Sequence, residues 1–182
     1  SWGINAKALP IKDVQVYGQA LIDHIKTSAS TTANSRFATQ LGIKYYDAFT
    51  IPNLDIQIEG NYATPFMYTS ADSVTSHTHF NQPMAHPMGA GFTEGILAIR
   101  YQPAKKIYID LQQVWVKRNE AVGGMNAGTH ILTPNIINYP YGITNSFMQN
   151  GATSSLFFNA NIAYELIPNL FVEAGGGYNK FT

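Results

Sequence analysis

Long stretches of alternating residues constrain the fold of this 182-residue chain more than any other feature. In the segment 14–23 every even position is apolar or glycine, whereas most odd positions are polar. The segments 54–63 and 157–166 alternate in the same way. A period of two residues is typical of β-strands with two different faces. The apolar residues of the first segment also fit one face of a helix, but Gly18 and several β-branched residues favour a strand.

Eight strands follow from this pattern, and several are much longer than the five or six residues that are usual in globular sheets. Their predicted ranges are 2–9, 13–25, 35–48, 54–66, 91–101, 106–119, 154–166 and 170–181. A strand that crosses an outer membrane needs about 9–11 residues at a steep tilt. The strand lengths therefore favour an all-β transmembrane barrel with antiparallel, up-and-down strands.

Connections of two kinds alternate between these strands. Short turns that contain proline lie at 9–13, 51–54, 102–106 and 167–170. Long polar connections lie at 26–34, 67–90 and 120–153. Barrels of the bacterial outer membrane have short turns on the periplasmic side and long loops outside. The alternation of connections therefore also favours a membrane barrel.

This orientation would place both ends of the chain outside the cell, whereas bacterial barrels normally have both ends in the periplasm. We therefore expect residues 1–182 to form a single barrel segment of about eight strands. That segment would be a fragment of a larger barrel that has at least one further strand at each side.

Aromatic residues on the apolar face are expected near both ends of the strands. Tyr45, Tyr101 and Tyr164 precede the tight turns, and Tyr62, Trp115 and Tyr178 lie toward the opposite ends. Two aromatic girdles around an aliphatic band are typical of a protein in a bilayer. Gln113 on the apolar side of its strand argues slightly against this interpretation, and a soluble sandwich with aromatic residues in its core is the alternative.

The polar face carries charged residues that would line the lumen of a barrel. They are Asp23, Lys44, Asp55, Glu59, Glu94, Arg100, Asp110, Glu165 and Glu173. Ion pairs or water are the expected content of such an interior. Carboxylate pairs on this face are too common to indicate acid–base catalysis.

Composition and motifs exclude several classes of function. The net charge is zero and the pI is about 6.9, which argues against a nucleic-acid partner. The absence of cysteine excludes disulfides, thiolate zinc sites and a cysteine nucleophile. His77, His79 and His86 form the best candidate for a metal site, but no carboxylate lies close to them in the sequence, so we expect no metal and no cofactor. No G-x-S-x-G context or other nucleophile motif is present, so we expect no enzyme.

The segment 79–95 reads HFNQPMAHPMGAGFTEG and continues to Ile99–Pro103. It is similar to the N-Q-P-x-A-H-P-x-G-A-x-F-x-E stretch of Bacteroidota outer-membrane proteins of the gliding-motility RemB type, which are related to Wzi-like capsule-assembly barrels. The similarity spans about 25 residues. It implies an outer-membrane barrel that acts at the cell surface in gliding motility, adhesion, or the attachment of exopolysaccharide or capsule. It implies no established set of binding residues.

The loop 76–95 is the best candidate for contact with a ligand or partner, because its histidines, prolines and glycine-rich end favour an ordered structure. The expected contact residues are His79, Phe80, Asn81, Gln82 and His86, with Glu94 and Arg100 continuing inward on the lumen side. Membrane lipid is one expected partner, and surface polysaccharide or other outer-membrane proteins are the others. A porin-like diffusion channel and a soluble glycan-binding β-domain are the alternative functions.

Overall fold

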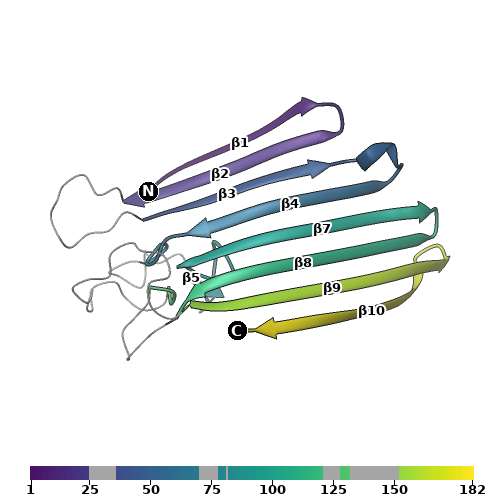
Figure 1. Ribbon diagram of the computed structural model, residues 1–182. Helices are drawn as coiled ribbons and strands as arrows, with labels where there is room; N and C mark the ends of the chain where they lie inside the picture. Colours follow the sequence, from purple (N-terminus) through teal and green to yellow (C-terminus); the bar gives the residue numbers. More distant parts are fainter. Residues whose placement is uncertain (25–35, 70–77, 81, 121–127, 132–151) are drawn as a thin grey trace.

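The computed structural model describes residues 1–24, 36–69, 78–80, 82–120, 128–131 and 152–182 (Figure 1). Its main feature is one antiparallel sheet of eight strands in the order β1-β2-β3-β4-β7-β8-β9-β10. These strands are β1 (Trp2–Ile11), β2 (Val14–His24), β3 (Arg36–Tyr45), β4 (Leu54–Ala63), β7 (Phe92–Ala104), β8 (Ile107–Asn119), β9 (Ala152–Ile167) and β10 (Leu170–Phe181). The prediction of an all-β, antiparallel, up-and-down arrangement is thereby confirmed.

Small elements complete the described structure. β5 (Thr78–His79) and β6 (Gln82–Pro83) form a separate two-stranded hairpin, and η1 (Ala48–Thr50) is a single turn of 3-10 helix. In the described part of the chain, no helix has the length and apolar character that a membrane-crossing helix needs.

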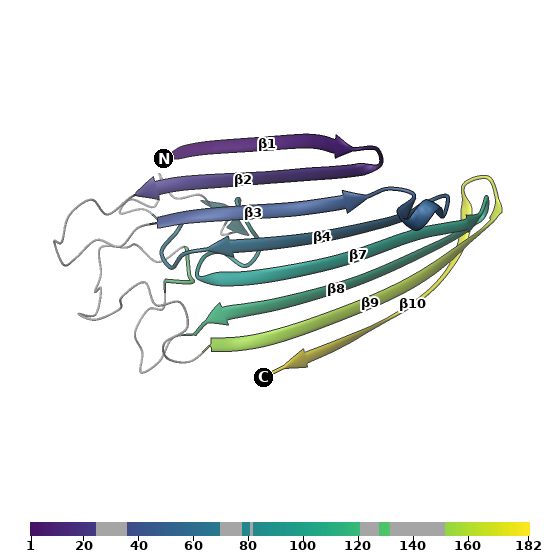
Figure 2. The same ribbon diagram turned by 45° about the horizontal axis from the view of Figure 1, so that its top comes forward.

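The sheet is curved and remains open (Figure 2). In the described residues β1 pairs only with β2, and β10 pairs only with β9. Every residue of β1 and β10 is exposed, on both faces. The two outermost strands therefore each have one unpaired edge.

All eight long strands occur where the alternation predicts them; most of their ends agree within two residues, and three differ by three residues. The third strand ends at Tyr45 rather than at residue 48, because Asp47 adopts a left-handed backbone with φ 45° and η1 follows it. The fourth ends at Ala63 rather than at residue 66, because the backbone turns there and Phe66 has φ 61°. The fifth continues past residue 101 to Ala104 through an irregular register.

The tight connections all lie at one end of the sheet, called here the turn end, and the long connections lie at the loop end (Figure 1). Asp13, Asn53 and Asn169 occupy the left-handed region in three of the tight turns, with φ 64°, 59° and 68°. Asp and Asn tolerate this conformation better than most residues because their short side chains bond the local backbone. The residue types at these three positions therefore suit the tight turns.

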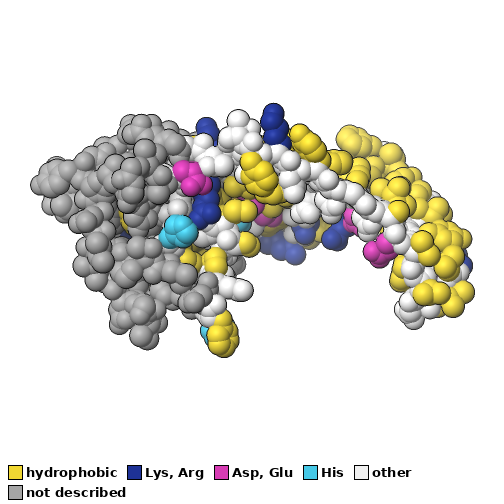
Figure 3. All heavy atoms as spheres, turned by 90° about the horizontal axis from the view of Figure 1, so that it is seen from below, with side chains coloured by type: hydrophobic (Ala, Val, Ile, Leu, Met, Phe, Trp, Pro, Cys, Tyr) yellow, Lys and Arg dark blue, Asp and Glu magenta, His cyan; other side chains and the backbone are white. Residues whose placement is uncertain are grey.

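The register sorts the strand residues onto two faces, as the alternation predicts. The outer face carries residues such as Leu41, Ile58 and Ile162, whose exposed fractions are 70%, 61% and 52%. Hydrophobic side chains gather on the convex side of the curved sheet (Figure 3). The inner face carries the charged residues of the opposite alternation, and the register places eight of the nine predicted ones there. The ninth, Asp23, lies at an irregularity of the register and forms an ion pair with Arg36.

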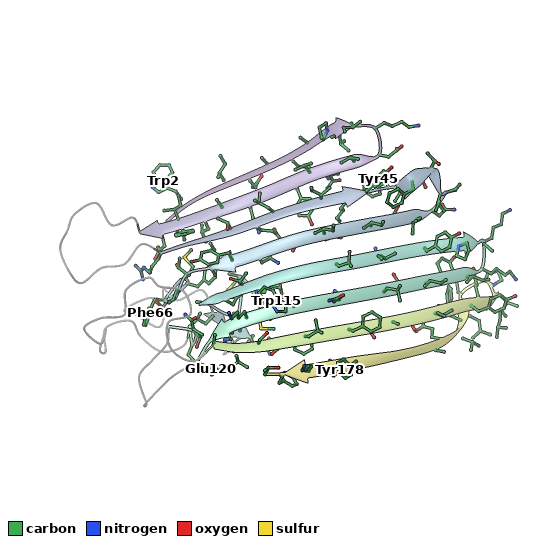
Figure 4. All side chains as sticks on the ribbon, viewed as in Figure 1. Trp2, Tyr45, Phe66, Trp115, Glu120 and Tyr178 are labelled. Carbon is green, nitrogen blue, oxygen red and sulfur yellow. The ribbon has the colours of Figure 1, made fainter. Side chains whose placement is uncertain are left out.

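The outer face also carries the predicted aromatic rows. Tyr45 lies at the turn end, whereas Trp2, Trp115 and Tyr178 lie toward the loop end (Figure 4). Trp2 was not among the predicted aromatic residues and is 85% exposed. The pairing register places the following residues on this face as well: Tyr62, Tyr101, Tyr164, Gln113, Lys117 and Lys180.

Candidate functional site

Three segments outside the long strands gather on the inner face at the loop end. We call residues 64–69, 85–91 and 128–131 the loop cluster. The backbone N–H of Phe66 donates to the carbonyl of Gly128 at 2.8 Å, and the N–H of Gly91 donates to the carbonyl of Thr64 at 3.2 Å. These bonds join segments that are far apart in the sequence. The loop cluster is therefore a built structure rather than three independent turns.

A small hydrophobic core holds the loop cluster against the sheet. Phe92 and Met67 are 2% and 1% exposed and are the most deeply buried large side chains of the described residues. The core consists of Ala38, Ala63, Met67, Tyr68, Ala90, Phe92 and Ile131. Ala38, Ala63 and Phe92 belong to β3, β4 and β7 and point to the inner face, so this core lies on the polar side of the sheet. Its position differs from that of a soluble sandwich, whose core would cover the apolar face.

Two glycines allow the close packing within the loop cluster. Gly89 has φ 74°, and a Cβ atom there would lie 2.8 Å from the carbonyl oxygen of Thr129. Gly128 has φ 72°, and a Cβ atom there would lie 2.6 Å from the ring of Phe66. A side chain at either position would meet both backbone strain and a clash.

His86 connects the loop cluster to the inner face. Its Nε2 atom lies 3.1 Å from Oε2 of Glu94, and its ring stacks on Phe92 with centroids 4.3 Å apart. The backbone N–H of Met88 donates to Nδ1 of His86 at 3.2 Å. Because Nδ1 accepts this bond, the proton of a neutral His86 is on Nε2 and is donated to Glu94. The glutamate and histidine thus form a directed hydrogen bond that holds the loop over the sheet.

Glu94 continues this contact into a network that crosses the inner face. The Glu94 side chain is 7% exposed and accepts a hydrogen bond from the amide nitrogen of Asn61 at 2.8 Å. The same nitrogen donates to Oε1 of Glu59 at 3.0 Å. Burial of carboxylates is costly unless hydrogen bonds satisfy them, and both glutamates meet this condition.

Glu59 is the centre of the network and is bound by four side chains. Gln40 donates to it at 2.7 Å and Gln57 at 3.2 Å, and Tyr17 and Asn61 complete the set. The Tyr17 ring covers Gly42 on the next strand, where any Cβ atom would overlap the ring. The network therefore depends on glycine at that position, because the ring must lie flat on the strand to reach Glu59.

A cavity of about 470 Å³ lies beside this network, between the inner face and the loop cluster. Its floor is formed by β1, β2, β3 and β4, and its other lining residues include Tyr68, Ala85, His86 and Phe92. Burial raises the pKa of the Tyr68 phenol above its usual value, so the hydroxyl stays protonated over the physiological range. The lining of the cavity thus combines neutral polar groups with aromatic rings.

Of the two inner-face residues expected to continue from the loop, Glu94 contacts the loop through His86, whereas Arg100 has no such contact among the described residues. Arg100 lies toward the turn end of β7, where its Nε atom is 3.3 Å from Oδ1 of Asp110. Both side chains are exposed, so this ion pair contributes little to stability. The five residues between Glu94 and Arg100 run along the strand, so Arg100 lies far from the loop end.

The remaining predicted contact residues lie apart from the cavity. His79 and Gln82 are exposed on the β5–β6 hairpin, and Phe80 is 89% exposed at its tip. The ring of His79 packs against Phe80 with centroids 4.3 Å apart. Asn81 lies outside the described residues. Contact of these residues with a ligand or partner stays a prediction.

The candidate metal site is not assembled by the described residues. His77 lies outside them, and His79 and His86 belong to different parts of the loop. The described residues contain no group of three or more His, Cys, Asp or Glu in a metal-binding arrangement.

Several residues of the site were missed from the sequence. Tyr17, Gln40 and Asn61 occupy ordinary polar-face positions of three different strands, and nothing in their local sequence distinguishes them. Only the pairing of those strands brings the side chains together. Their shared feature is visible only in the register, which makes Gln40 the cross-strand partner of both Gln19 and Asn61.

No family model, curated protein or solved structure matches this chain. The geometry of the sheet and of the loop cluster is therefore the basis for the functional argument.

Proposed function

We propose that this chain forms eight neighbouring strands of a transmembrane β-barrel in a bacterial outer membrane, and that it acts at the cell surface without catalysing a reaction. The activity we propose is a role in gliding motility, adhesion, or the attachment of exopolysaccharide or capsule, as the resemblance of segment 79–103 implies. Its partners would be membrane lipid together with surface polysaccharide or other outer-membrane proteins.

The exposed apolar outer face carries this proposal. Ile58 in the middle of β4, its cross-strand partner Ile43 and Ile162 on β9 are at least half exposed, with exposed fractions of 61%, 50% and 52%. Soluble monomers rarely expose such a continuous apolar surface. Hydrocarbon is the environment in which this surface is stable, and the charged inner face would then line the lumen.

The residues at both ends of the outer face also support its assignment to lipid. Aromatic residues lie toward both ends of the strands, and aromatic side chains are enriched at membrane interfaces. Lys117 and Lys180 lie beyond the loop-end aromatic row on this face, where long basic side chains can reach the lipid headgroups. Gln113 is the polar exception within the band.

The open edges of β1 and β10 need partners in this environment, because lipid leaves no water to satisfy unpaired backbone groups. The barrel would therefore be closed by further strands between β10 and β1. This requirement is consistent with a larger barrel of which the described sheet is one part.

The loop cluster argues against an open diffusion channel. It covers the inner face of β3, β4 and β7 at the loop end, with its own buried core. Recordings in planar bilayers would test this point. We expect no large steady conductance, and a large open-channel conductance would make a porin-like channel the better proposal.

Membrane insertion and surface function are tested separately. Membranes of expressing cells should release the protein with detergent but not with alkaline carbonate or urea, whereas release by carbonate would favour a soluble glycan-binding domain. Deletion of the gene should reduce gliding, adhesion or retained surface polysaccharide, and expression of the intact protein should restore it. Unchanged behaviour in all three assays would contradict the proposed surface role.

A further inference from the structure

A straight row of amide side chains crosses the floor of the cavity. Asn5 is directly opposite Gln19, Gln19 is opposite Gln40, and Gln40 is opposite Asn61. The row then ends at Glu94, the strand partner of Asn61. Neighbouring strands are about 4.8 Å apart, so these four amides form a regular series on four adjacent strands.

Two amides of this row are held by hydrogen bonds within the protein, and the other two have no hydrogen-bond partner among the described residues. The amide nitrogens of Gln40 and Asn61 are bound by Glu59, and Asn61 also binds Glu94. In the described part of the chain, no hydrogen bond engages the side chains of Asn5 and Gln19. The amide oxygens of Gln40 and Asn61 also have no described partner, and neither is among the buried unpartnered atoms. The row therefore presents both donors and acceptors to the cavity.

The charges around the cavity select against anions. Its lining contains no lysine or arginine among the described residues, and two of its amides, Gln40 and Asn61, bind the carboxylates of Glu59 and Glu94. A phosphate, sulfate or uronic acid in the cavity would lie near these carboxylates without a lysine or arginine in the lining to balance it. A neutral ligand meets no such penalty.

The aromatic lining completes the chemistry. Tyr68 and Phe92 line the cavity together with the imidazole of His86. Binding sites for small molecules combine apolar and aromatic walls with a few polar groups that orient the ligand, in volumes of roughly 300–1,000 Å³. The cavity of about 470 Å³ is of this size.

We propose that this cavity binds one or two residues of a neutral saccharide. A hydroxyl group both donates and accepts a hydrogen bond, as an amide does, so the row can bind successive hydroxyls without any charged group. The C–H faces of the sugar would lie against the aromatic rings. This inference deepens the proposed surface function, on which it rests, and it assigns ligand recognition to the floor of the cavity rather than to the exposed β5–β6 hairpin.

Binding measurements on the detergent-solubilised protein test the proposal. The probes are neutral disaccharides of hexose and N-acetylhexosamine, compared with disaccharides that contain glucuronic acid, in isothermal titration calorimetry. The test variant combines Asn5→Leu with Gln19→Met, which removes two unpartnered amides while nearly conserving side-chain volume. The matched control is Gln112→Met, which removes an exposed amide of the same face on β8, outside the cavity lining.

We expect at least one neutral disaccharide to bind the unmodified protein, and the double variant to weaken that binding by tenfold or more. The Gln112→Met variant should bind as the unmodified protein does. Equal binding by the double variant, preference for the uronic acid probes, or no binding by any neutral probe would each overturn the proposal.

The same samples distinguish this inference from the proposed function. If the double variant stays resistant to carbonate extraction and loses only saccharide binding, both proposals are supported. If the protein inserts into membranes and supports surface attachment but binds no neutral probe, the cavity proposal fails while the surface function stands. Extraction by carbonate would instead contradict the membrane assignment, whatever the cavity binds.

Discussion

Replacing Ile58 by arginine distinguishes a lipid-facing from a water-facing outer face. Ile58 is the central outer-face residue of β4, between Ile56 toward the turn end and Tyr62 toward the loop end. Its exposed fraction is 61%, so less than half of its surface is buried by neighbouring side chains. In water, Ile58→Arg would therefore lose less than half of the roughly 1.5–3 kcal/mol that full burial of isoleucine contributes.

In a bilayer the same substitution has a larger cost. Arginine near the midplane destabilises a transmembrane barrel by about 2–4 kcal/mol. At about 1.4 kcal/mol for each factor of ten, this corresponds to a decrease of about 30- to 700-fold in the folding equilibrium constant. The two environments thus predict effects that a folding titration can separate.

The assay is folding of the protein into phospholipid vesicles at increasing urea concentration, followed by tryptophan fluorescence. Gln112→Arg is the control, because Gln112 is exposed on the inner face and its neighbour across the strand pair is Ala98. We expect the control to change the free energy of unfolding by less than about 0.5 kcal/mol. If Ile58→Arg and Gln112→Arg have equal and small effects, the assignment of the outer face to lipid is refuted.

Three further predictions test the site and the orientation of the sheet. Glu94→Ala should destabilise the loop end by about 1–3 kcal/mol, because it leaves buried donors without their acceptor, and limited proteolysis should then cut the loop cluster faster. Gly42→Ala should cost about 1–3 kcal/mol in urea unfolding, because the new methyl group displaces the tyrosine ring above it, whereas Gly60→Ala, with nothing within 4 Å, should be neutral or stabilising. A cysteine at Phe80 should react with a membrane-impermeant maleimide on intact cells and one at Asn53 should not; the opposite pattern would reverse the orientation.

Local patterns of the sequence are enough to predict the strands and their faces. The alternation in segments such as 54–63 requires only that successive side chains of a strand point to opposite sides. The left-handed turn conformations of Asn53 and Asn169 also follow from the residue itself. The ends of strands were less predictable, because the early end of β3 depends on the backbone of Asp47 and on η1.

Local patterns do not predict the candidate site, because it depends on the register between strands and on the packing of the loop cluster against the inner face. A shift of one residue between two strands would move Gln40 or Asn61 to the other face and destroy the amide row. His86 reaches Glu94 only because the loop cluster packs its own core on the inner face, whereas Arg100, on the same side of the same strand, is carried to the other end. By itself, then, the sequence determined which residues share a face. Only the tertiary structure decided which of them meet, because those contacts join strands and loops that no local pattern relates.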